Sequence, residues 1–306
     1  MSLMTDLVLA ALSSLVPGGV RLSALRRDDR VVRWAESGSG GPAVVLDAAL
    51  GEPGTLAWAG VMPLVAPRAR VLAYDRAGLG ASDPVTPLTL QAQVDGLLAV
   101  IHEAGGRCVV AGHSWGALLG QLAALRHPEL IAGLVLVDPA EEEFLAAMPD
   151  EARRQEIASG DEFVEQYESG KLPDTIREIV GSFARRLTGD RQAQALILDA
   201  YVSSYAKQSQ VAAIAGEKRL VFESLPAIRQ ARAGATLPAV PVVVFSATTG
   251  RAPGERHEWT RLQARVAASV PGGEHVVLPD TSHAVNQERP AEIAQAINHI
   301  IDAARG

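Results

Sequence analysis

The chain is poor in cysteine and has no excess of positive charge, and both features limit the functions that it can have. One of its 306 residues is cysteine, so no disulfide can form within the chain. Cys108 lies in an apolar run that predicts a strand, where we expect a small buried side chain without a redox role. The net charge is −7, whereas surfaces that bind nucleic acid or anionic membranes need clustered cations. We therefore expect no nucleic-acid partner.

The chain also lacks the patterns of a membrane span, a metal centre and a nucleotide site. The apolar N-terminal run, 5–16, is too short to cross a bilayer and should form a helix that packs on the domain or on a second subunit. The seven histidines show no His-x-x-x-His spacing, and no Gly-x-Gly-x-x-Gly follows a strand-like run. We expect no metal, no cofactor and no firm membrane association, and a cytoplasmic monomer or homodimer.

Strand-like and helix-like runs alternate along most of the chain. The strand-like runs are rich in Val and Leu, and they span 31–36, 43–47, 70–75, 107–112, 130–138, 240–247 and 275–279. Helical patterns span 88–104, 117–126 and 291–304. Continuous apolar runs are typical of strands buried on both faces, so the alternation predicts an α/β fold with a mostly parallel central sheet covered by helices on both faces.

One stretch, 140–235, breaks this alternation and contains only helix-like pieces. They span 150–158, 175–187, 191–207 and 210–232, with breaks at Gly160, Gly170, Pro173, Gly189 and Pro226. We expect an N-terminal helical segment, 1–20, a core formed by 21–139 and 236–306, and an all-helical cap, 140–235. The stretch holds most of the chain's few aromatic residues, among them Phe144, Tyr201 and Tyr205. They either build the core of a thin helical layer or line a substrate cavity.

The pattern Gly112-x-Ser114-x-Gly116 lies between a strand-like run and a helix-like run. A serine at such a turn adopts a strained backbone conformation that exposes its hydroxyl, and small residues two positions away let strand and helix approach. The N–H groups that follow lie at a helix N-terminus and face the charge that develops in acyl transfer. The pattern therefore indicates a nucleophile; the alternative is a simple turn between strand and helix.

Together these features resemble the α/β-hydrolase fold family over nearly the whole chain. The resemblance rests on the Ser114 turn, the strand–helix rhythm, the helical stretch after Asp138 and the segment 74–83, which resembles the family's Asp-x-x-Gly-x-Gly-x-Ser loop. That loop is usually structural. The resemblance implies a Ser–acid–His triad in this chain order, no cofactor, and hydrolysis by acyl transfer.

A serine nucleophile needs a general base, and histidine is suited to this role near neutral pH. His283 lies in the loop after the last strand-like run, where the resemblance places the catalytic histidine, and Asp280 stands where the family commonly has glycine. The alternative is a loop histidine that packs against the cap. We expect His113, beside the nucleophile, to point away from it and to pack.

The acid is less evident, because the commonest family position, after the run 240–247, holds no Asp. Asp138 ends the preceding strand-like run, at an alternative family position, and we choose it; a carboxylate there is on the correct side of the sheet. Glu255 and Glu258 remain alternatives. Asp138 followed by proline is also ordinary turn chemistry.

The oxyanion donors should be the backbone N–H of Trp115 and that of Ala49 or Leu50, in the loop after 43–47. Asp47 should be structural. The Trp115 indole either lines the cavity or belongs to the core. The run 141–143 of three glutamates either forms a solvated face or recognises a cationic group, as in prolyl aminopeptidase relatives.

These features predict a serine hydrolase of a small to medium, largely apolar ester, lactone or thioester, with a small molecule as its partner. Aminopeptidase-like and C–C bond hydrolases share the same triad and stay open as alternatives. Epoxide hydrolase and haloalkane dehalogenase chemistry are disfavoured, because both use an aspartate where Ser114 stands. A protein of another class, which binds a ligand under the cap without turnover, is the remaining alternative.

Overall fold

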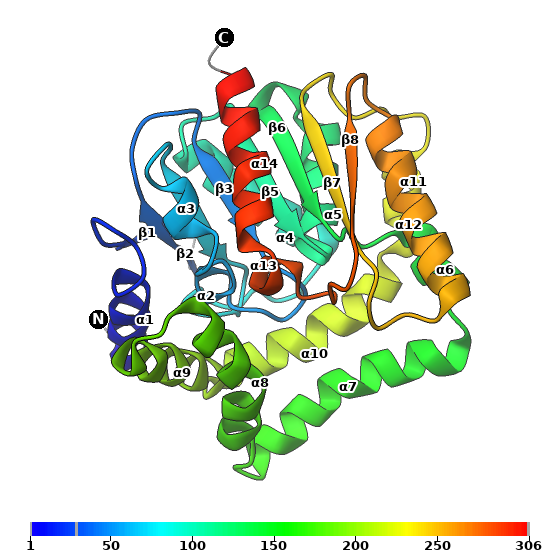
Figure 1. Cartoon of the computed structure of the whole chain (residues 1–306). Helices are drawn as coiled ribbons and strands as arrows, with labels where there is room; N and C mark the ends of the chain where they lie inside the picture. Colours follow the sequence, from blue (N-terminus) through cyan, green and yellow to red (C-terminus); the bar gives the residue numbers. More distant parts are fainter. Residues whose placement is uncertain (1, 28–29, 305–306) are drawn as a thin grey trace.

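The computed structural model describes residues 2–27 and 30–304, and its centre is one eight-stranded sheet (Figure 1). The strand order is β1-β2-β4-β3-β5-β6-β7-β8. The strands are β1 (Arg21–Arg27), β2 (Arg30–Ser37), β3 (Val44–Asp47), β4 (Val71–Asp75), β5 (Cys108–His113), β6 (Ile131–Val137), β7 (Val242–Ala247) and β8 (Glu274–Leu278).

Strand β2 pairs antiparallel with both β1 and β4, and the strands from β4 to β8 pair in parallel. The mostly parallel sheet and the seven expected strands are therefore confirmed. The eighth, β1, is an addition to the prediction. Arginines occupy three of its seven positions, so it lacks the continuous apolar run of the inner strands. It lies at the edge of the sheet, where a strand has a hydrogen-bonded neighbour on one side and none on the other.

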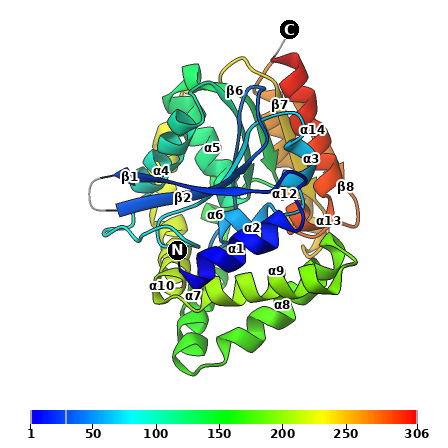
Figure 2. The same cartoon turned by 90° about the vertical axis from the view of Figure 1, so that its left-hand side faces the viewer.

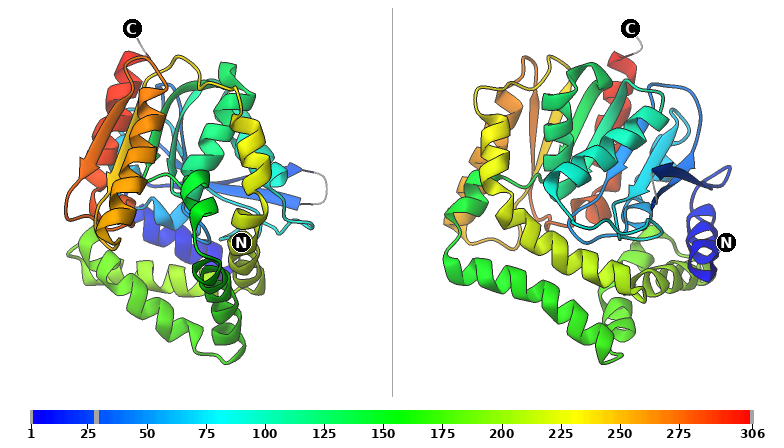
Figure 3. Two further views of the ribbon diagram at one scale, coloured as in Figure 1. Left: turned by 90° about the vertical axis from the view of Figure 1, so that its right-hand side faces the viewer. Right: turned by 180° about the vertical axis from the view of Figure 1, so that it is seen from behind.

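Helices cover both faces of the sheet (Figures 1 and 3). Residues of α3 (Met62–Val65) and α14 (Pro290–Ala303) share one apolar cluster with β3 and β6. Residues of α4 (Leu90–Glu103), α5 (Trp115–Arg126) and α12 (Pro253–Ala268) share the cluster on the other face. Short helices α2 (Gly54–Ala57), α13 (Val285–Glu288) and η1 (Pro128–Leu130) lie in the connections. Two apolar faces explain why the inner strands read as unbroken hydrophobic runs.

Six helices are inserted between β6 and β7, where the sequence has its strand-free stretch. They are α6 (Glu142–Ala147), α7 (Asp150–Glu168), α8 (Leu172–Leu187), α9 (Arg191–Tyr205), α10 (Gln208–Glu223) and α11 (Leu225–Arg232). Helices α7 to α10 lie beyond one edge of the sheet, whereas α11 packs beside α5 (Figures 1 and 3). We call residues 142–232 the helical insertion.

The expected break at Gly160 is wrong, because α7 runs through it. A Cβ on Gly160 would lie 3.0 Å from the Cα atom of Ala215 in α10, so this glycine serves close helix packing and not a turn. The break at Pro226 is confirmed, because α10 ends at Glu223 and α11 begins at Leu225 with proline in its first turn.

The apolar N-terminal run forms α1 (Leu3–Ser13), which packs against α9 of the helical insertion (Figure 2). Val8, Ala11 and Leu12 are buried in the main apolar cluster. Packing on the domain, the first of the two expected arrangements, is what the structure shows. Among the described residues no helix combines the length and apolarity that a membrane span requires.

Candidate active site

Ser114 lies at the turn from β5 to α5, and its backbone is strained. Its φ of 52° and ψ of −112° place a non-glycine residue in a region that side chains rarely adopt. A Cβ on Gly112 would lie 2.5 Å from the Cα atom of Ala117, and one on Gly116 would lie 2.5 Å from the carbonyl oxygens of Asp47 and Ala48. Both flanking positions therefore require glycine, as the pattern predicts.

His283 and Asp138, 145 positions apart in the chain, meet at the same edge of the sheet. His283 Nδ1 lies 2.6 Å from Asp138 Oδ2. Asp138 directly follows β6, and His283 lies in the loop after β8. In that loop Asp280 has a φ of 54°, a left-handed conformation that glycine adopts more readily than aspartate.

Asp138 is fully buried and accepts several hydrogen bonds besides that of His283. Trp259 Nε1 donates at 2.7 Å, the Ala247 N–H at 3.0 Å and Gln263 Nε2 at 3.2 Å, all to Oδ1. Burial alone would raise the pKa of this carboxyl, but the hydrogen bond and charge of His283 and the donors Trp259 and Ala247 outweigh it and lower the pKa. Asp138 is therefore an ionised carboxylate held against one ring nitrogen of His283.

The alternative acids lie elsewhere. Glu255 caps the first turn of α12 by accepting the Ala252 N–H, and Glu258 pairs with Arg261 on the exposed side of that helix. Neither contacts His283. Of the three candidates for the acid, Asp138 is the one that the structure brings to the histidine.

Ser114 and His283 line one cavity of about 720 Å³. No hydrogen bond joins the Ser114 hydroxyl to the His283 ring, although both residues belong to the described part of the chain. The His283 side chain is 45% exposed, and its second ring nitrogen, Nε2, makes no hydrogen bond with a described residue. Apo active sites often show such loose geometry, which tightens when substrate binds.

His113 is buried and packs, as expected, and its partner is the loop that carries His283. Its ring centre lies 4.9 Å from that of His283, its Nε2 lies 2.7 Å from the His283 carbonyl oxygen, and its Nδ1 lies 3.9 Å from Glu52 Oε2. Burial would raise the pKa of Glu52, but the neighbouring imidazoles of His113 and His283 outweigh it and lower the pKa. His113 therefore fixes the loop that carries His283.

The cavity wall is mostly apolar. Phe144, predicted from the sequence, is part of it, together with Leu145, Met148, Val221, Phe222 and Trp259. Ala49, Leu50 and Trp115 lie beside Ser114 in the same wall. Tyr201 and Tyr205 do not line it: Tyr201 packs against Phe183, and Tyr205 against Phe163. For these two tyrosines the other interpretation, a core for the helical layer, is the one that fits.

The Trp115 indole belongs chiefly to the core. Its ring is 1% exposed, and Nε1 donates a hydrogen bond of 2.6 Å to Gln93 Oε1 in α4. Gln93 in turn donates through Nε2 to Glu217 in α10. Trp115 therefore presents mainly its backbone to the cavity.

A buried charged cluster formed by Arg76, Asp47 and Glu217 lies under the loop that contains Ala49. Arg76 donates to Asp47 Oδ1 at 2.7 Å and to both carboxylate oxygens of Glu217 at 2.7 and 2.9 Å. It also donates to the carbonyl oxygens of Ala48 at 2.6 Å and Ala49 at 2.7 Å. Asp47 therefore has the structural role expected of it, and the cluster joins α10 to the core.

The cluster also holds Gly51. Glu217 Oε2 accepts the Gly51 N–H at 2.7 Å, and Gln210 Nε2 donates to the Gly51 carbonyl oxygen at 2.9 Å. Both side chains come from α10. The sequence offers no signal for this contact, because the partners are 166 and 159 positions apart.

The three glutamates at 141–143 do not form a solvated face. Glu141 and Glu142 are buried and both bind Arg232 at the end of α11, while Glu143 pairs with Arg265. Burial raises the pKa of Glu141 to about 7, against the opposing charge of Arg232. Two arginines thus bind the three carboxylates, and none of the three glutamates lines the cavity of Ser114, so the run is not placed to recognise a cationic substrate there.

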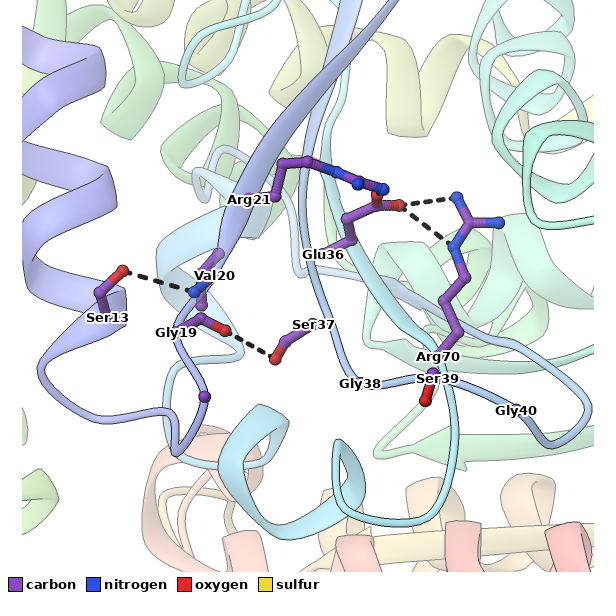
Figure 4. A pocket seen from close by; sticks show the side chains of 11 residues that line it. Ser13, Gly19, Val20, Arg21, Glu36, Ser37, Gly38, Ser39, Gly40 and Arg70 are labelled. Atoms are coloured by element: carbon purple, nitrogen blue, oxygen red, sulfur yellow. Dashed lines mark hydrogen bonds and ion pairs between the residues drawn. The ribbon is translucent and has the colours of Figure 1, made fainter.

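A second cavity, of about 470 Å³, lies at the opposite, amino-terminal edge of the parallel strands (Figure 4). Glycine-rich loops line it, and its two arginines, Arg21 and Arg70, share one acidic partner, Glu36. It contains no serine–histidine pair. Nor does the described part of the chain hold a cluster of three or more His, Cys, Asp or Glu side chains that could bind a metal ion.

Curated proteins resemble short parts of this chain. Lipase LipV of Mycobacterium tuberculosis is 39% identical over 75 residues, 24% of this chain and 29% of LipV. The strigolactone esterase RMS3 of Pisum sativum is 36% identical over 87 residues, 26% of this chain and 33% of the esterase. Polyketide synthase ThaQ of Burkholderia thailandensis is 37% identical over 125 residues, 40% of this chain and 5% of ThaQ. The chain thus matches about a third or less of the length of these relatives.

Solved structures resemble the whole fold. Cfl2 of Burkholderia cenocepacia superposes with a TM-score of 0.74 at 24% identity, covering 92% of this chain and 95% of Cfl2. The epoxide hydrolase VrEH1 of Vigna radiata gives 0.72 at 18% identity, covering 93% and 98%. A model of the alpha/beta hydrolase family matches residues 18–296. The chain therefore belongs to the alpha/beta hydrolase family.

Proposed function

We propose that this hydrolase-family protein is a serine hydrolase that cleaves a small to medium, largely apolar ester, lactone or thioester by acyl transfer. The observation that carries the proposal is the pairing of His283 with a buried, ionised Asp138 in a cavity that also contains the strained Ser114. The family's epoxide hydrolases and dehalogenases use an aspartate nucleophile, and this chain has a serine there.

The proposed reaction has two halves. Ser114 Oγ attacks the carbonyl carbon while its proton passes to His283, and Asp138 stabilises the resulting imidazolium through Nδ1. The tetrahedral intermediate collapses, and the leaving alcohol or thiol takes the proton from His283. Water then attacks the acyl-serine, with His283 as base, and releases the carboxylic acid and free Ser114.

The Arg76 cluster supports the proposed oxyanion donors. In a trans peptide the N–H points opposite to the carbonyl of the preceding residue. Because Arg76 binds the carbonyl oxygens of Ala48 and Ala49, the N–H groups of Ala49 and Leu50 point away from Arg76. Both residues line the cavity beside Trp115, whose N–H begins α5. These are the groups expected to bind the oxyanion.

The helical insertion is proposed to act as a cap, because Phe144, Leu145, Met148, Val221 and Phe222 line the cavity from α6 and α10 and their junctions. The aminopeptidase alternative loses its support, since Glu141 and Glu142 are bound by Arg232.

Labelling by a fluorophosphonate tests the proposal. We expect the wild-type protein to be labelled and Ser114→Ala not to be, and Asp138→Asn to lower turnover of a p-nitrophenyl ester by roughly 10³–10⁴ without unfolding the protein. Folded wild-type protein that takes no label would favour the ligand-binding alternative. Nearly intact turnover in Asp138→Asn, with loss in Glu255→Gln, would show that Asp138 is not the acid.

A further inference from the structure

Arg251 is a cation in the wall of the active-site cavity that has no acidic partner within hydrogen-bond or ion-pair distance among the described residues. It lies in the turn after β7, and its side chain lines the same cavity as Ser114 and His283. Its guanidinium makes no hydrogen bond and no ion pair with the residues that the structure describes. Asp138 and Glu255 act on its charge only at longer range.

Two aromatic rings hold the guanidinium in place. Its Cζ lies 3.8 Å from the ring centre of Trp259 and 5.4 Å from that of Phe144, and the two rings meet edge to face at 5.0 Å. Stacking uses the flat face of a guanidinium and leaves the N–H groups in its plane free. Trp259 is itself fixed by its hydrogen bond to Asp138. The free donors are therefore held in a defined position close to the catalytic pair.

The other cationic side chains of the cavity wall each have an acidic neighbour, although Glu52 approaches His113 no closer than 3.9 Å and its Oε2 atom makes no hydrogen bond. Lys218 pairs with Glu156, Glu52 faces His113, and Asp138 accepts hydrogen bonds from His283 and Trp259. Arg251 is thus the one cation in this wall whose side chain makes no hydrogen bond and no ion pair with a described residue. A half-buried charge without a partner is unfavourable, and an anionic ligand would remove that penalty.

We propose that the substrate carries a carboxylate and that Arg251 binds it while Ser114 attacks the ester carbonyl. This inference rests on the proposed function. A planar guanidinium binds a carboxylate through two parallel hydrogen bonds, which a point charge cannot reproduce. The apolar wall of Phe144, Leu145 and Met148 fits the hydrocarbon part between the two groups. The substrate class is an ester or lactone of largely apolar character with one free carboxylate.

Matched esters test this substrate class by turnover. On the acyl side, p-nitrophenyl hydrogen adipate is compared with p-nitrophenyl hexanoate; on the alcohol side, 4-acetoxybenzoate is compared with its methyl ester. For at least one pair we expect the wild-type kcat/KM to favour the charged ester by about 10- to 100-fold. Arg251→Gln should bring that ratio close to one, and Arg251→Lys should give an intermediate ratio because charge remains without the planar fork.

The control is Arg261→Gln, which removes an arginine paired with Glu258 on the exposed side of α12 and should leave the ratio as in the wild type.

A binding measurement separates this inference from the proposed function. In the Ser114→Ala background, calorimetry should show tighter binding of the charged ester, lost when Arg251→Gln is added. Turnover of both esters at a ratio that Arg251→Gln does not change would overturn the inference and leave the hydrolase standing. Selective binding of the charged ester without turnover by the wild type would overturn the hydrolase proposal and leave the inference standing. Equal or undetectable binding of both esters to Ser114→Ala would overturn the inference.

Discussion

At the scale of single residues, backbone strain marks the site. Three non-glycine residues of the described chain have positive φ values: Ser114, Asp138 and Asp280. Ser114 directly follows β5, Asp138 directly follows β6, and Asp280 lies in the loop after β8. All three positions are at the carboxyl edge of the parallel strands. Such conformations persist only where surrounding contacts hold them, and they concentrate at functional sites. Here the strain aims a hydroxyl, a carboxylate and the loop of an imidazole at one cavity.

Another residue-scale consequence concerns pH. Burial raises the pKa of Glu141 from 4.5 to about 7, so the folded protein keeps a proton there that the unfolded chain releases. The free energy of unfolding should therefore fall as pH rises from about 4.5 to about 7, by at most about 3 kcal/mol from this group. Urea denaturation at pH 5 and pH 7.5 should show a smaller fall for Glu141→Gln than for the wild type. Glu143→Gln, whose carboxylate is half exposed, should follow the wild type, and parallel profiles for all three proteins would contradict the argument.

The sequence predicts Ser114 from the pattern around it, and Asp138 and His283 from their places after strands together with what the family resemblance implies. It does not predict that His113 packs on the loop of His283, because its partners there, the His283 carbonyl oxygen and Glu52, are distant from it in the chain. The sequence does not predict the pairing of Glu141 and Glu142 with Arg232 either. A run of acids usually lies in solvent, and its partner is 90 or more positions away.

At the scale of elements, the contact between α7 and α10 depends on Gly160. A Cβ there would lie 3.0 Å from Ala215 Cα and 3.1 Å from Lys218 Cδ. Gly160→Val should therefore push the helices apart and lower the free energy of unfolding by about 1–3 kcal/mol. Gly96→Ala is the matched control, since Gly96 is also inside a helix but a Cβ there meets nothing within 4 Å. It should stabilise by about 0.5–1 kcal/mol. Equal effects of the two changes in thermal unfolding would refute this account.

Elements with strong apolar patterns were predictable, and polar ones were not. The inner strands read as strands because both of their faces are covered. Strand β1 and helix α12 were missed, because β1 is rich in arginine and α12 carries charged residues along most of its length. Both lie at the periphery of the sheet, where pairing and packing partners, rather than hydrophobic periodicity, determine the structure.

At the scale of the whole molecule, Glu217 connects the helical insertion to the proposed oxyanion loop. Glu217→Gln should lower the free energy of unfolding by about 3 kcal/mol, because it leaves the buried Arg76 with Asp47 as its remaining acidic partner. It should also lower kcat about tenfold or more, since Gly51 loses its carboxylate acceptor and the loop shifts. Denaturation and ester turnover measure the two effects. The control is Glu223→Gln, because Glu223 is exposed and is the last residue of the same helix; it should change neither stability nor turnover. Wild-type stability and turnover of Glu217→Gln would rule out the connection between the insertion and the oxyanion loop.

No local pattern could reveal this arrangement. Arg76 lies in a loop that resembles a structural motif of the family, and Glu217 lies within a helix whose apolar pattern gives no sign of a buried acid. The two residues are 141 positions apart, and their contact exists only after the insertion has folded onto the sheet. The overall fold follows from hydrophobic patterning, whereas the way its two parts are joined follows from a few long-range polar contacts.

The Arg76 cluster also constrains how a substrate can reach Ser114. Swinging α10 outward would carry Glu217 away from the buried Arg76 and break their ion pair, which costs about 3–5 kcal/mol and disfavours opening on that side. Thr249 and Gly250 border the same cavity and are exposed to solvent. We therefore expect substrate to enter and product to leave at the opposite end of the cavity, beside the turn that carries Arg251, while α10 stays in place.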